Sequence, residues 1–157
     1  GEVLDAVYGT FEGASPRHHL RIRGNLGVQV VGDHDKLIEV LSNLVDNAIK
    51  YSVDGGLVVI EGRTVGGRFE VRVIDEGVGI PEEERSAIFE RFGRLRRSET
   101  EHVRSTGLGL YLVQELLGLM DTTISVESNK GAGSTFVFDV PLVTEGFVEA
   151  LNDELAA

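Results

Sequence analysis

A carboxylate followed by two glycines lies in the segment DEGVGI, Asp75 to Ile80. Phe69, Val71 and Val73 alternate with polar residues just before it, and this period predicts a strand with one buried face. A carboxylate at a strand end can accept a hydrogen bond from an amino group such as that of adenine, and neighbouring glycines let a flat ligand approach the backbone. The same pattern is also typical of a strand that ends in a glycine-rich turn and binds nothing.

Two more glycines lie in TGLGL, Thr106 to Leu110, where an arginine-rich segment meets an apolar helix predicted over residues 108–120. Glycines at a helix entrance expose backbone N–H groups, and the helix dipole adds positive potential there. The segment could therefore bind phosphate. Alternatively, the glycines only allow the helix to pack tightly.

Polar residues recur on one face of a helix predicted over residues 36–51, with Asp33 or Asp35 as its cap. Asn43, Asn47 and Lys50 are spaced at i, i+4 and i+7, opposite an apolar stripe. Amide oxygens can hold Mg²⁺ beside phosphate oxygens, and a lysine can meet a phosphate as a point charge. The polar face of an amphipathic helix without a ligand accounts for the same spacing.

The composition restricts the classes of protein. The chain has 157 residues, no cysteine and a net charge of -11, which excludes thiol chemistry and disfavours binding to nucleic acid or an anionic membrane. No apolar run reaches the ~20 residues that span a bilayer. A cluster of arginines between Arg85 and Arg104 nonetheless supplies the local positive charge that an anionic ligand would need.

The remaining elements follow from periodicity and turn residues. A helix is predicted over residues 2–13, and another over 82–92, where Pro81 and three glutamates suit the first turn. Residues 93–106 are interpreted as a long polar loop. The predicted strands are 19–24, 28–32, 57–63 and 69–75, with a Gly-Gly turn before the last of them and a closing hairpin over 123–141.

Helices mixed with strands that reverse through short turns favour the α+β class. We expect one domain over residues 1–157, built as a two-layer α/β sandwich whose mixed, largely antiparallel sheet is covered on one face by helices. The core would span about 20–141. Residues 1–13 would be the remnant of a preceding helix, and 144–157 a C-terminal tail with helical spacing.

Together these segments resemble the ATP-binding catalytic domain of bacterial sensor histidine kinases, within the GHKL or Bergerat-fold ATPases. DKLIEVLSNLVDNAIKYS (35–52) is similar to the N box of that family, and DEGVGI to its G1 box. IFERFGRL (88–95) is similar to the F box, STGLGLYLV (105–113) to the G2 box, and GAGSTF (131–136) to the final glycine turn. The resemblance covers about residues 30–141 and implies the Bergerat fold.

The resemblance implies ATP and Mg²⁺ as cofactors and a role for each matching residue. Asp75 would accept the adenine amino group, Asn47 would hold Mg²⁺, and Arg94 would approach the γ-phosphate, with Asn43 and Arg94 as catalytic residues. Residues 93–106 would form a mobile ATP lid. The implied ATP-binding residues are Asn43, Asn47, Lys50, Tyr51, Asp75, Gly77, Gly79, Ile80, Arg94, Thr106, Gly107, Leu108, Gly109, Leu110 and Ser134.

Three features depart from the family pattern. Arg104 and Ser105 precede Thr106, where that family often has a glycine. None of the four histidines lies in a phosphoacceptor motif, and the residues before the N box are too few for the two long helices of a dimerisation domain. Related ATPases that hydrolyse ATP with water have a glutamate at the position of Asn43.

The implied function is donation of the γ-phosphate of Mg·ATP to a histidine on a separate dimerisation domain, in two-component signalling with a response regulator downstream. The chain is expected to be a cytoplasmic histidine kinase catalytic domain, monomeric alone and without nucleic-acid or direct membrane contact. Its parent protein could be anchored in the bacterial inner membrane. Two alternatives stay open: an anti-sigma-factor serine kinase of the same fold, which the F box disfavours, and a nucleotide-sensing module without transfer activity.

Overall fold

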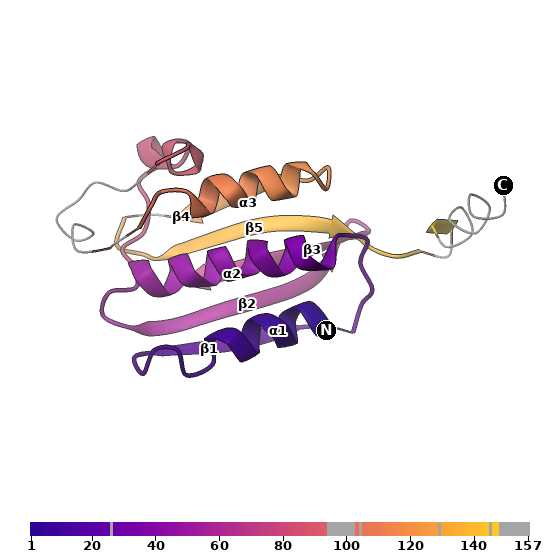
Figure 1. Cartoon of the computed structure of the whole chain (residues 1–157), viewed down its shortest axis with the longest axis horizontal. Coiled ribbons are helices and arrows are strands. Elements are labelled where there is room, and N and C mark those ends of the chain that lie inside the picture. The colour runs from indigo at the N-terminus through magenta and orange to yellow at the C-terminus, as the bar shows by residue number, and fades with distance from the viewer. Residues whose placement is uncertain (26, 94–102, 104, 129, 145, 148–157) are drawn as a thin grey trace.

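The computed structural model describes residues 1–25, 27–93, 103, 105–128, 130–144 and 146–147. Figure 1 shows the helices lying over one face of a single sheet. The helices are α1 (Glu2–Phe11), α2 (His34–Tyr51) and α3 (Gly109–Gly118), with two short 3₁₀ turns, η1 (Glu82–Glu84) and η2 (Ala87–Phe89). The strands are β1 (His18–Gly24), β2 (Gly56–Val65), β3 (Arg68–Asp75), β4 (Ile124–Ser128) and β5 (Ser134–Pro141).

The strands form one sheet in the order β1-β2-β3-β5-β4. β1 pairs in parallel with β2, and every other neighbouring pair is antiparallel. At the end of β3, Asp75 lies opposite Ser134, the first residue of β5. The predicted α+β class and the mixed, largely antiparallel sheet are therefore confirmed.

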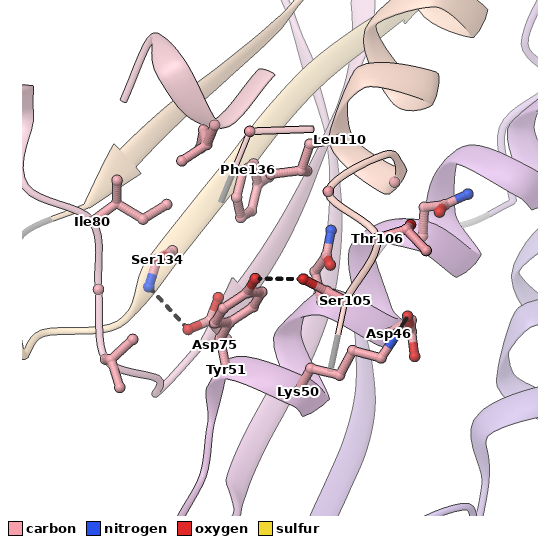
Figure 2. A pocket seen from close by; sticks show the side chains of 18 residues that line it. Asp46, Lys50, Tyr51, Asp75, Ile80, Ser105, Thr106, Leu110, Ser134 and Phe136 are labelled. Atoms are coloured by element: carbon pink, nitrogen blue, oxygen red, sulfur yellow. Dashed lines mark hydrogen bonds and ion pairs between the residues drawn. The ribbon is translucent and has the colours of Figure 1, made fainter. Parts of the chain in front are cut away.

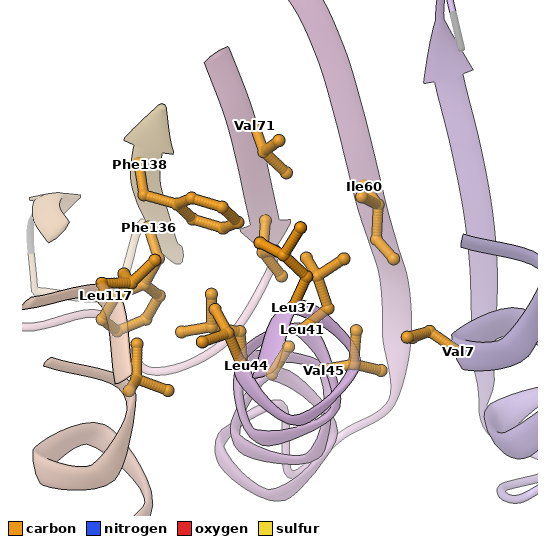
Figure 3. Packing of buried hydrophobic residues seen from close by; sticks show 14 of the residues in the cluster. Val7, Leu37, Leu41, Leu44, Val45, Ile60, Val71, Leu117, Phe136 and Phe138 are labelled. Carbon is orange, nitrogen blue, oxygen red and sulfur yellow. The ribbon is translucent and has the colours of Figure 1, made fainter. Parts of the chain in front are cut away.

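The core lies between the sheet and the helices. Alternation along β3 and β5 buries every second side chain toward α2 and α3, and full burial of such apolar side chains stabilises the fold by roughly 1.5–3 kcal/mol each. Residues that meet in this layer include Leu37, Leu41, Leu44, Ile60, Val71, Leu117, Phe136 and Phe138 (Figure 3).

Helix α2 is capped by Asp33, whose carboxylate accepts the backbone N–H of Lys36 at 3.0 Å. Asp33, and not Asp35, is therefore the cap. Leu37, Leu41 and Leu44 are buried against the sheet, so the predicted apolar stripe is confirmed. The packing of this stripe fixes the direction in which the polar side chains of the last two turns point.

The predicted helix over residues 82–92 is wrong. The structure has the two 3₁₀ turns η1 and η2 there. They are closed by backbone hydrogen bonds between residues three apart, such as Glu90 N–H to Ala87 O at 3.2 Å. Arg85 donates to the carbonyl oxygen of Ser128, and Ile88 is buried in the core. These long-range contacts, rather than a helical ladder, determine the path of the segment.

The strand predicted over residues 28–32 is also wrong, because only Val30 pairs there, in an isolated bridge with Leu142. Segment 28–31 does not pair with β1, which pairs with β2 instead. It runs beside the end of β5, where Val31 donates its backbone N–H to Pro141 O. Most of the predicted lid 93–106 and of the tail 144–157 lies outside the described residues. In the described part of the chain, no helix has the length and apolar character to cross a membrane.

Candidate functional site

A cavity of about 220 Å³ opens where the end of α2, the adjoining ends of β3 and β5, and the start of α3 meet. Figure 2 shows side chains from these separate segments pointing toward one another across it. Its lining consists of Asn43, Asp46, Asn47, Lys50, Tyr51, Asp75, Val78, Gly79, Ile80, Ile88, Gly93, Ser105, Thr106, Gly107, Gly109, Leu110, Ser134 and Phe136.

Asp75 is the buried carboxylate of this cavity, with 7% of its surface exposed. Its Oδ1 accepts the backbone N–H groups of Gly77 at 2.8 Å and Ser134 at 3.2 Å. Oδ2 accepts no hydrogen bond from any described residue and is left for a ligand with a donor group. Burial raises the pKa of Asp75 to about 6, although the two N–H donors act in the opposite direction.

The glycine loop after Asp75 is held between α2 and β4. Val78 donates its backbone N–H to Tyr51 O at 3.1 Å, and Ile80 donates its own to Ser128 Oγ at 2.8 Å. Gly77 has no room for a side chain, because a Cβ there would lie 2.6 Å from Tyr51 O. This glycine therefore allows the loop to pack against the end of α2.

The polar face of α2 forms the opposite wall. Asn43 donates from Nδ2 to Glu39 O at 2.9 Å, which leaves its Oδ1 as an acceptor toward the cavity. Lys50 Nζ forms an ion pair with Asp46 Oδ2 one turn earlier. The wall thus presents the amide groups of Asn43 and Asn47 beside a cation whose charge is balanced within the helix.

The start of α3 closes the cavity. Gly107 adopts a φ of 70°, a left-handed conformation that favours glycine, and its carbonyl accepts the N–H of Phe92 at 2.9 Å. Helix α3 begins at Gly109 without a side-chain cap, so N–H groups of its first turn remain available for an anion. A Cβ at Gly109 would lie only 3.0 Å from Asn43 Oδ1, so the glycine keeps the helix end and α2 close.

The structure brings most of the predicted site residues together. Gly77 and Leu108 do not line the cavity; Gly77 instead supplies the N–H that orients Asp75, and Leu108 precedes α3. Arg94 lies outside the described residues. The predicted residues at the cavity are Asn43, Asn47, Lys50, Tyr51, Asp75, Gly79, Ile80, Thr106, Gly107, Gly109, Leu110 and Ser134.

Sequence reasoning missed several residues of the lining. In the sequence, Ser105 is only a departure from the family pattern, yet its Oγ lies 3.4 Å from the Tyr51 hydroxyl across the cavity. Asp46 precedes Asn47 on α2 and could have been found from the helical spacing. Val78, Ile88, Gly93 and Phe136 lie within the recognised motifs, but no local pattern shows that these members of the motifs reach the cavity, because the tertiary fold brings them there.

Comparison with known proteins identifies the family. Residues 32–144 match the family described as histidine kinase-, DNA gyrase B-, and HSP90-like ATPase. The chain belongs to this family of ATPases. As an ATPase domain of this family it binds ATP, and its relatives place it with the catalytic domains of sensor histidine kinases.

Two curated relatives and one solved structure illustrate the similarity. The chain is 40% identical over 129 residues to the sensor-like histidine kinase SenX3 of Mycobacterium tuberculosis, covering 82% of this chain and 32% of SenX3. It is 39% identical over 121 residues to the sensor histidine kinase RcsC of Escherichia coli, covering 77% of this chain and 13% of RcsC. A structure of the mycobacterial sensor histidine kinase MprB superposes with a TM-score of 0.74 at 27% identity, covering 90% of this chain and 93% of that one. The ATPase domain therefore spans about a third or less of the curated relatives.

Proposed function

We propose that this ATPase domain binds Mg·ATP in the cavity and donates the γ-phosphate to a histidine on a separate dimerisation domain of its parent protein. The observation that carries the proposal is the meeting of three groups at one cavity. These are the Oδ2 acceptor of Asp75, the amide face of α2 and the uncapped start of α3.

The adenine base would occupy the end of the cavity at Asp75. Oδ2 would accept a hydrogen bond from the adenine amino group, while Gly79 and Ile80 would lie along the base. Because Oδ1 is held by Gly77 and Ser134, the carboxylate would need no reorientation when the base enters. A buried acceptor of this kind discriminates against a base with a carbonyl at the same position.

The phosphates would lie between α2 and the start of α3. Among the described residues, no group of three or more His, Asp or Glu could hold a metal alone, so the cation would be shared between protein oxygens and phosphate oxygens. The amide oxygens fit this hard cation, with Asn47 as the direct ligand and Asn43 beside it. Mg²⁺ would reduce the negative charge of the phosphates, and Lys50 and the N–H groups after Gly107 would contact them.

Transfer requires an acceptor that the described part of this domain does not place at the cavity. The His18 ring is hydrogen-bonded to Ser15 Oγ and to Ser52 O. The His34 ring contacts the Asp35 carboxylate at the start of α2. Neither lines the cavity. The phosphoacceptor would therefore come from the dimerisation domain, with Arg94 approaching the γ-phosphate, and a response regulator would receive the phosphoryl group afterwards.

The proposal is tested by incubating the domain with γ-labelled ATP, alone and with the separately purified dimerisation domain of its parent. We expect an acid-labile label on the acceptor domain only, and its loss in Asn47→Ala. A stable label on His18, His19, His34 or His102 would contradict the proposal. Rapid phosphate release without the acceptor would instead favour a hydrolytic member of the family.

A further inference from the structure

Strand β1 is an edge strand of the sheet (Figure 1). It pairs in parallel with β2 on one side, and no described strand lies on the other. Arg17 O accepts the N–H of Gly56 at 3.0 Å, so backbone groups of alternate residues from Arg17 onward face β2. Leu20 and Ile22 therefore turn their N–H and C=O groups outward, where another strand can pair with them.

The side chains of β1 divide cleanly between the two faces. Leu20 and Ile22 are half-buried against the core, whereas Arg21 and Arg23 are exposed on the face that carries no helix. Arg17, also exposed, has the same parity just before the strand. We call Arg17, Arg21 and Arg23 the β1 stripe.

The β1 stripe differs from the other arginines of the sheet. Arg63 and Arg72 both pair with Glu70, and Arg72 also reaches Glu127 at 2.5 Å. Arg68 pairs with Asp139 at 2.8 Å.

By contrast, no arginine of the β1 stripe has an ion pair with any described residue. Even Glu61, which lies opposite Arg23 in the strand register, forms none with it. In a chain with a net charge of -11, this is a local excess of unpaired positive charge. Such an excess attracts carboxylates from outside the domain.

We propose that the outer edge of β1 binds an acidic, extended segment of a partner protein, which adds to the sheet as a further strand. Same-face residues repeat about every 6–7 Å along any strand, so alternate carboxylates of the segment would come opposite Arg21 and Arg23 and, beyond the exposed His19, opposite Arg17. Main-chain bonds to Leu20 and Ile22 would supply affinity, and the arginines would select acidic sequences.

A second copy of the domain is a poor occupant of this edge. Two copies would bring one β1 stripe against another, and like charges on adjacent strands destabilise their pairing. The charges that prevent self-pairing thus favour an acidic partner. The edge is separate from the nucleotide cavity, because no residue of β1 lines that cavity.

The test titrates the isotopically labelled domain with a short synthetic peptide in which glutamate and threonine alternate, followed by the backbone amide signals. We expect shifts and slowed hydrogen exchange at Leu20 and Ile22, weakening steeply with added salt. Arg21→Gln/Arg23→Gln should reduce the peptide affinity by about tenfold. Arg63→Gln, the same change on β2, should leave the affinity nearly unchanged, and neither variant should alter ATP binding.

Several results would overturn the proposal. They are absence of binding, equal binding of a peptide that alternates lysine and threonine, shifts confined to residues outside β1, and full affinity in the Arg21→Gln/Arg23→Gln variant. Concentration-dependent shifts of the same amides without peptide would assign the edge to a second copy. Unchanged ATP binding verifies in each case that the domain is folded.

Discussion

The carboxylate of Asp75 accepts the backbone N–H of Ser134 at 3.2 Å, although 59 residues separate them in the chain. The bond joins the last residue of β3 to the first residue of β5, so the register of the sheet orients the carboxylate. Because the carboxylate of Asp75 is removed from water, its ionised form lowers the free energy of unfolding. The cavity is therefore organised for a ligand at the expense of the stability of the ligand-free domain.

The first prediction concerns the pH dependence of folding. The pKa of Asp75 is raised from 3.8 to about 6, so its contribution to stability is fully present below pH 3.8 and is lost as the pH rises through 6. The ionised group thus costs about 3 kcal/mol at neutral pH. Asp75→Asn should remove this cost, because the amide oxygen can still accept from Gly77 and Ser134.

Urea unfolding at pH 5 and pH 7.5 measures this effect. The free energy of unfolding of Asp75→Asn relative to the wild type should rise by between about 1 and 2 kcal/mol from the lower to the higher pH. Using the difference between two proteins cancels the other titrating groups. A difference that does not change with pH would show that Asp75 is not held in a desolvated site.

The second prediction concerns the metal. Asn47→Ala should weaken ATP binding in Mg²⁺ by about tenfold or more, roughly 1.4 kcal/mol, and much less in EDTA, since the amide oxygen acts on the phosphates through the cation. Lys50→Ala is the matched variant, because a direct phosphate contact should be lost in both conditions. Equal losses for Asn47→Ala with and without Mg²⁺ would contradict a metal role.

The third prediction concerns the ion pair between Lys50 and Asp46. Their side chains are 39% and 43% exposed, so Asp46→Asn should change stability by less than about 1 kcal/mol. The variant frees Lys50 and removes a negative charge beside the phosphates, and ATP should bind roughly two- to fivefold more tightly. Asp5→Asn, on the exposed surface of α1, removes the same charge away from the cavity and serves as control. Weaker ATP binding by Asp46→Asn would mean that Asp46 contributes directly to the site.

The fourth prediction compares two glycines of α3. A Cβ at Gly109 would lie 3.0 Å from Asn43 Oδ1, whereas one at Gly118 meets nothing within 4 Å. Gly109→Ala should therefore weaken ATP binding several-fold by displacing Asn43, and Gly118→Ala should leave it unchanged while stabilising the helix by about 0.5–1 kcal/mol. Isothermal titration calorimetry and thermal unfolding distinguish the two effects. Equal ATP affinity in both variants would show that the close approach of Gly109 to Asn43 is not needed for ATP binding.

Local patterns predicted the elements that local physics determines. The leucine stripe predicted α2, and the turn at Gly66 and Gly67 predicted the pairing of β2 with β3. The parallel pairing of β1 with β2 could not be predicted, because hydrophobic period identifies a strand but not its neighbour. The prediction of a helix over residues 82–92 was wrong because the contact of Arg85 with Ser128 helps to determine the path of this segment. Such a contact between residues far apart in the chain leaves no local sequence pattern.

The site was predictable to the extent that its residues lie in compact motifs. Asp75 and the asparagines of α2 could be recognised from strand-end and helical spacing. The proximity of Tyr51 and Ser105 could not, since it depends on how the segment before α3 packs against the end of α2. Phe136 reaches the cavity because Ser134, two residues earlier, is in register with Asp75.

Nucleotide selectivity at Asp75 tests the central claim most directly. Calorimetric titration of the wild-type domain with ATP and GTP in Mg²⁺, repeated with Asp75→Asn, measures whether Oδ2 accepts a hydrogen bond from the base. We predict that the wild type strongly prefers ATP and that Asp75→Asn loses this preference while remaining folded, because the variant can present a donor to the amino group of adenine. Unchanged ATP affinity and selectivity in a folded Asp75→Asn would contradict adenine binding at Asp75.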